Sequence, residues 1–109
     1  MLREEIAGRL LKNVYHPVSA VFEMGEQEEI VSAVMFDTEF GSLPTLLMEG
    51  TKEIWLFTNH PEGRSDLYEK DWENIRLLRS LYPQASLRVM ITNEDTACRE
   101  YALFMPGEL

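Results

Sequence analysis

The clearest pattern in the chain is an apolar stripe at helical spacing, which predicts a long helix over residues 65–82. Ser65, or Asp66 with Glu69 three residues on, would cap its start, and Pro83 would end it. The residues of the stripe recur at steps of three and four, with two leucines widening its second half: Tyr68, Trp72, Ile75, Leu78 and Tyr82, then Leu77 and Leu81.

Residues that alternate between two faces predict strands over 18–24, 30–36 and 86–92, and a hairpin across Gly50-Thr51-Lys52 predicts two more over 43–49 and 53–58. The strand at 53–58 is apolar on both faces, which is typical of a strand covered on both sides. A further helix is predicted over residues 2–14. Residues 95–105 fit a helix or a strand, and their spacing favours the helix.

These elements define an α+β protein with an antiparallel sheet of about five strands. The N-terminal helix and the long helix 65–82 are expected to pack on one face of it. The length of 109 residues, without repeats or linkers, predicts a single α+β domain over 1–109. Because a lone sheet has to protect its edge strands and its second face, a homodimer is expected.

The acidic composition narrows the choice of partners. Ten basic against nineteen acidic residues give a net charge of -9, which repels nucleic-acid phosphates and anionic membranes and suits a basic protein partner. The single Cys98 favours a reducing compartment, and the first residues lack the apolar core of a signal peptide. The sequence therefore predicts a cytoplasmic protein.

A surface for a protein partner is predicted from two groups of residues. Four glutamates surround the turn between the first two strands, and three aromatic residues stand in a polar connector or near the C-terminus. These seven candidates are Glu23, Glu26, Glu28 and Glu29, with Phe40, Tyr101 and Phe104. They favour a small acidic protein-binding module of the chaperone, adaptor or immunity type rather than an enzyme.

The common catalytic motifs are absent from the sequence: a glycine-rich phosphate loop, Gly-x-Ser-x-Gly, Cys-x-x-Cys and His-Glu-x-x-His. His16 and His60 both precede a proline, and with Asp37, Glu39 or Cys98 they would hold a metal only if the fold gathered them. Neither catalytic residues nor a metal site are therefore predicted.

One stretch supports an alternative. Phe57-Thr58-Asn59, followed by Arg64-Ser65 and by the segment 83–87, resembles the flavin-binding split-barrel proteins of the pyridoxamine-phosphate-oxidase type. The resemblance implies an FMN-binding protein, with oxidoreductase activity, whose phosphate site uses Thr58, Asn59, Arg64 and Ser65. Apart from this FMN alternative no cofactor is predicted. The order of elements is also similar to that of small acidic secretion chaperones, which are dimeric.

Overall fold

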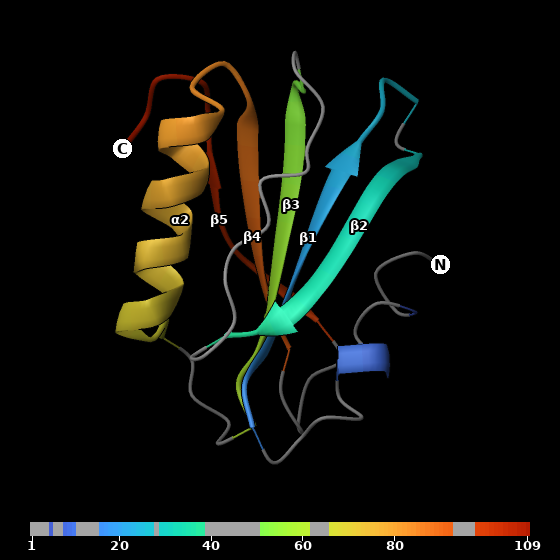
Figure 1. The fold of residues 1–109 in the computed structure, drawn as a ribbon, viewed down its shortest axis with the longest axis vertical. Coiled ribbons are helices and arrows are strands. Elements are labelled where there is room, and N and C mark those ends of the chain that lie inside the picture. Colours follow the sequence, from blue (N-terminus) through green and yellow to red (C-terminus); the bar gives the residue numbers. More distant parts are fainter. Residues whose placement is uncertain are drawn as a thin grey trace.

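The computed structural model describes residues 5, 8–10, 16–27, 29–38, 51–61, 66–92 and 98–109. Its α+β class agrees with the prediction (Figure 1). The elements are β1 (Val18–Met24), β2 (Ile30–Asp37), β3 (Glu53–Asn59), α2 (Glu69–Leu81), β4 (Ser86–Thr92) and β5 (Arg99–Phe104), with a short helical piece at residues 8–10. Four of the predicted strands recur with their ends within one residue, and the one predicted at 43–49 lies outside the described residues.

The five strands form one mixed sheet in the order β2-β1-β3-β4-β5. Neighbouring strands are antiparallel except for β3 and β4, which are parallel. Figure 1 shows the cause, since α2 carries the chain from the end of β3 back to the start of β4. A helical crossover of this kind joins parallel strands. The prediction of a wholly antiparallel sheet is therefore wrong at this pair.

Each face of the sheet carries its own buried apolar cluster, because side chains alternate along a strand. One cluster joins α2 to the three central strands through Ile75 and Leu78 with Val21, Ile54, Leu56, Leu87, Val89 and Ile91. The second cluster contains Leu10 with Ala20, Phe22, Phe57 and Met90. β3 contributes to both, as its two apolar faces predicted. Leu10 lies with the cluster that α2 does not join, so the expectation of both helices on one face fails for this residue.

The start of α2 differs from the prediction. The helix begins at Glu69 instead of residue 65, and its N-cap is Tyr68. The Tyr68 backbone N–H donates to Asp71 Oδ2 at 2.9 Å. A carboxylate at the third helical position is the acid of a capping box, so Asp71 fills the role expected of Glu69. Asp71 is buried against β3, whereas Glu69 is exposed, so the buried acid is the one that caps the helix.

The apolar stripe of α2 is only partly buried. Its members divide into the buried Ile75 and Leu78, the half-buried Trp72 and Tyr82, and the exposed Leu77 and Leu81. The buried face of the helix is therefore narrower than predicted, because the side chains of Leu77 and Leu81 remain exposed to solvent.

Arg79 holds the C-terminal end of α2. Its guanidinium is buried and donates to the carbonyl oxygens of Tyr82, Pro83 and Ala85, at 3.2, 3.3 and 2.6 Å. It also donates to the carbonyls of Phe104 and Met105, at 3.2 and 3.0 Å. One side chain thus connects the end of the helix to the end of the last strand.

The last element is a strand, so the preference for a helix over 95–105 is wrong. Arg99–Phe104 pairs antiparallel with β4. The register of this pairing shifts by one residue between Val89 and Met90 of β4. Tyr101 and Phe104 pack against the cluster that contains α2. Because β5 covers the outer side of β4 and lends two aromatic rings to the core, tertiary packing outweighs the local helical spacing.

Candidate functional site

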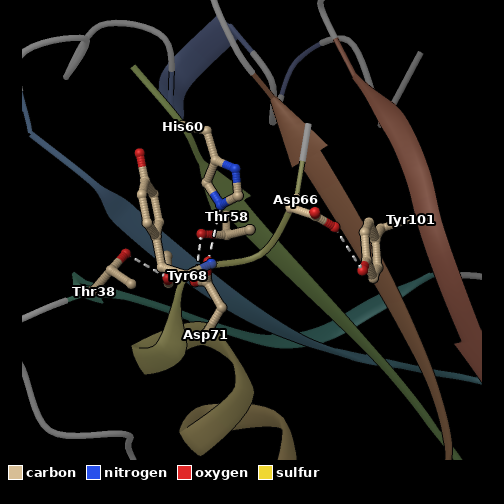
Figure 2. A network of polar contacts seen from close by, with 8 residues as sticks. Thr38, Thr58, His60, Asp66, Tyr68, Asp71 and Tyr101 are labelled. Atoms are coloured by element: carbon tan, nitrogen blue, oxygen red, sulfur yellow. Dashed lines mark hydrogen bonds and ion pairs between the residues drawn. The ribbon is translucent and has the colours of Figure 1, made fainter. Parts of the chain in front are cut away.

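The most elaborate polar structure is a buried network around Asp71, which we call the Asp71 cluster: Thr58, His60, Tyr68 and Asp71. Thr58 Oγ1 donates to Asp71 Oδ1 at 2.8 Å, and His60 Nε2 lies 2.9 Å from Asp71 Oδ2 (Figure 2). The Tyr68 ring lies against the imidazole with 4.5 Å between centroids.

The position of the Asp71 cluster follows from the crossover. Thr58 and Asn59 end β3, and the His60 backbone N–H donates to the Thr92 carbonyl at the end of β4, at 2.8 Å. The carboxyl ends of parallel strands are where open α/β sheets commonly bind ligands. Here, however, the side chains of His60 and Asp71 are 0% and 1% exposed. The closed cluster therefore connects the end of β3 to the first turn of α2.

Two of the four residues of the FMN alternative, Thr58 and Asn59, are among the described residues. Thr58 and Asn59 are fully buried, and the Thr58 hydroxyl is already given to the Asp71 carboxylate. A phosphate at Thr58 would approach this negative charge, which is unfavourable. Arg64 and Ser65 lie outside the described residues.

The predicted acidic group divides in two. Glu23 is only 6% exposed and accepts hydrogen bonds from Ser32 Oγ at 3.0 Å and Thr51 Oγ1 at 2.7 Å. Its carboxylate therefore belongs to the interior. Glu26 and Glu29 are exposed at the turn between β1 and β2, and Glu28 lies outside the described residues. The exposed acids that remain for a partner are those of the turn itself.

Two of the three predicted aromatic residues, Tyr101 and Phe104, lie far from these acids. Tyr101 and Phe104 are on β5, at the opposite edge of the sheet from β2. Four strand spacings separate the two edges, roughly 19 Å. Both rings pack edge-on against Trp72, with centroids 6.2 and 6.4 Å apart, and Phe40 lies outside the described residues. Among the described residues, the exposed acids of the turn and the rings of Tyr101 and Phe104 thus lie at opposite edges of the sheet.

Tyr101 has a further polar contact. Its hydroxyl donates to Asp66 Oδ1 at 3.3 Å (Figure 2). Burial, the negative charge of Asp66 and this hydrogen bond raise the pKa of the Tyr101 phenol above its usual range, and Arg99 opposes the shift. The neutral phenol is therefore the form that the fold favours.

The sequence did not identify the exposed apolar side chains of β2. Val31 and Met35 are 48% and 46% exposed. Met35 pairs with Ala20 and so lies on the side of the sheet opposite α2, and Val31 is the extra residue at the register shift of β2. Beside them is a hollow of about 190 Å³, lined by Arg9, Leu10, Ala20, Phe22, Ala33 and Met35. The signal was present in the alternation of residues 30–36, but alternation alone does not say which face is covered.

The two histidines each meet an aspartate. His16 Nε2 lies 3.2 Å from Asp37 Oδ2, and His60 pairs with Asp71 as above. Among the described residues, acids, histidines and cysteines form no group of three or more that could hold a metal. Each histidine is therefore described through its own aspartate partner, His16 beside the end of β2 and His60 beside the start of α2.

No family model matches this chain, and no curated protein matches it either. None of the helices in the described part of the chain has the length and apolar character needed to cross a membrane.

Proposed function

We propose that the chain is a protein-binding module that acts as a homodimer and recognises a basic protein partner. The observation that carries the proposal is the exposed end of the β1–β2 hairpin. Glu26 and Glu29 are exposed there, and Ile30 and Val31 follow directly on β2 with their apolar side chains exposed as well. Exposed apolar surface beside like charges is typical of protein-binding sites.

Charge supports a basic partner for the turn. The chain has a net charge of -9, and the only cation close to these acids among the described residues is Lys52, whose Nζ lies 4.0 Å from Glu26. Both side chains of this pair are largely exposed, so it contributes little. The turn therefore retains its negative potential, which attracts a basic surface and loses strength as salt rises.

Charge reversal at the turn tests the partner. Glu26→Lys with Glu28→Lys is expected to abolish recovery of a basic protein in a pull-down from the native lysate. The matched control is Glu69→Lys with Glu73→Lys, which changes the net charge by the same amount on the exposed side of α2. Partner recovery that survives the change at the turn, or that is lost equally in the control, contradicts a binding site at the turn.

The flavin alternative predicts a different result with the same protein. A split-barrel flavoprotein gives a yellow preparation, or a rise in melting temperature when FMN is added. A colourless protein that FMN does not stabilise is the result expected of the binding module.

A further inference from the structure

The edge strand β2 has an open side. In the sheet that the described residues form, β2 pairs with β1 alone. Natural edge strands are usually protected by lysine, proline or a bulge in the strand. β2 contains neither lysine, arginine nor proline, and its one charged residue is Asp37 at its C-terminal end. It has one irregularity, a register shift against β1 that leaves Val31 as the extra residue between Ile30 and Ser32. The regular stretch that follows, residues 32–36, is therefore suited to pairing with another strand.

We infer that β2 pairs antiparallel with β2 of a second copy, so that two sheets join into one across a twofold axis. The inference rests on the proposed homodimer and names its contact surface. A closed twofold interface uses the same surface on both subunits, and an uncharged strand that is apolar along one side is complementary to itself.

The alternation of β2 restricts the register of this pairing. Opposite residues of an antiparallel pair point to the same face, so a twofold axis has to pair odd positions with odd ones. Ala33 and Met35 are exposed on the face that their β1 partners Phe22 and Ala20 define, and Val31 is the exposed extra residue at the register shift. An axis through Ala33 sets Met35 opposite Val31 of the second copy. This register covers Val31, Ala33 and Met35 and leaves Ile30, the partner of Met24, at the end of the contact.

The hollow beside β2 agrees with the same register. Ala33 and Met35 form part of its wall, together with Phe22 and Leu10. The two small Ala33 side chains would meet at the axis, with a valine and a methionine on each side. The second copy thus extends the apolar wall and excludes water from a surface that one copy leaves open.

Charge favours a second copy over a basic partner along the strand itself. Residues 30–36 carry no charge, so a basic segment would find no counter-charge there. In the proposed register Glu29 approaches Asp37 of the second copy. His16, 3.2 Å from Asp37, offsets part of this repulsion when it is protonated. Two chains of charge -9 repel each other, so salt should strengthen the dimer and weaken the binding of a basic partner.

Sedimentation equilibrium tests the surface. The wild type is expected to be a dimer that becomes tighter as salt rises. Val31→Lys with Met35→Lys should weaken it by about tenfold or more, because apolar cross-strand pairs are replaced by like charges. The control is Leu103→Lys, at an exposed leucine on the opposite edge strand, which should leave the dimer unchanged. Circular dichroism melting checks that each variant is folded.

Cross-linking tests the register. With Cys98→Ser as background, Ala33→Cys places two thiols at the axis, whereas Ser32→Cys sets each thiol opposite Val34 of the second copy. A short bis-maleimide should link the first variant faster than the second, and Leu103→Cys should not be linked. A monomeric wild type, a dimer that the lysines leave intact, or faster linkage at Ser32 or Leu103 would overturn the inference. Failure of the pull-down alone would overturn only the basic partner.

Discussion

The two ends of α2 each bury a charged side chain, but they do so with different partners. At the first turn Asp71 accepts hydrogen bonds from the Thr58 and His60 side chains and from the Tyr68 backbone. At the last turn Arg79 donates only to backbone carbonyls, five of them. Both signs suit the helix dipole, negative at the N-terminus and positive at the C-terminus.

The difference shows two ways of keeping a charge inside a small protein. The Asp71 cluster depends on the identity of several side chains, since each donor is a separate residue that substitution can remove. The Arg79 contacts depend on one side chain, because the carbonyls belong to any sequence. Substitutions at several positions should therefore destabilise the N-terminal end of α2, whereas at the C-terminal end only substitution of Arg79 removes these contacts.

Replacing Asp71 should have the largest effect. Asp71→Ala removes the common acceptor of three donors, two of them on fully buried side chains, and should cost about 3–5 kcal/mol of unfolding free energy. Chemical denaturation measures it. Glu73→Ala, an exposed acid two residues on, is the control and should change stability by less than about 0.5 kcal/mol. Similar losses of unfolding free energy in the two variants would mean that the buried network of Asp71 stabilises the fold no more than an exposed acid does.

Arg79→Met keeps most of the side-chain volume and removes all five donor contacts. The expected loss is about 2–4 kcal/mol, because carbonyls at the end of α2 and of β5 lose a charged donor. Arg76→Met, on the exposed side of the same turn, should be nearly neutral. Amide hydrogen exchange should also become faster in β5 of the Arg79 variant. Unchanged protection of β5 would show that the Arg79 contacts do not stabilise this strand.

Trp72 lies on α2 between Asp71 and Arg79, and its substitution measures the contribution of apolar packing rather than of a buried charge. It is half-buried and meets Tyr101 and Phe104. Complete burial would predict a loss of about 3–5 kcal/mol for Trp72→Ala, so a half-buried ring should cost about 2 kcal/mol. Leu77→Ala is the exposed control. A loss for Trp72→Ala of less than about 1 kcal/mol in chemical denaturation would show that the ring is solvated.

Tyr101 should give the smallest effect, visible only at alkaline pH. Its pKa is raised in the folded protein, so the contribution to stability is present below the unfolded pKa and is lost as pH rises through the folded value. Melting temperatures of the wild type and Tyr101→Phe should therefore converge or cross above pH of about 10. An ultraviolet titration with no late-titrating tyrosine would refute this.

Local pattern predicted most of the fold. The strands at 18–24, 30–37, 53–59 and 86–92 follow from alternation, and the centre of α2 follows from helical spacing. β5 was mistaken for a helix because its residues fit both periods, and only pairing with β4 decides between them. The parallel pair was missed since short connections favour antiparallel neighbours, whereas a helix that connects two strands allows the parallel arrangement.

The polar sites were harder to predict than the fold. Asp71 stands four residues before Ile75 and seven before Leu78, so its position on the buried face could have been read from the sequence. Its partners could not, because Thr58 and His60 come from another element. Glu23 was predicted to be part of an exposed acidic surface, but it is buried. Its two hydrogen-bond donors, Ser32 and Thr51, belong to other parts of the chain and could not be identified from the sequence around Glu23.

The uncharged stretch of β2 has a consequence for handling the protein. Residues 30–36 form a seven-residue apolar segment without proline, a pattern prone to amyloid-like stacking when it is exposed. The acids on either side, Glu28, Glu29 and Asp37, act as gatekeepers through their charge. Their protection fades as the solution approaches the isoelectric point of about 4.6. Mild acid should therefore convert the protein to fibrils or precipitate sooner than neutral buffer does.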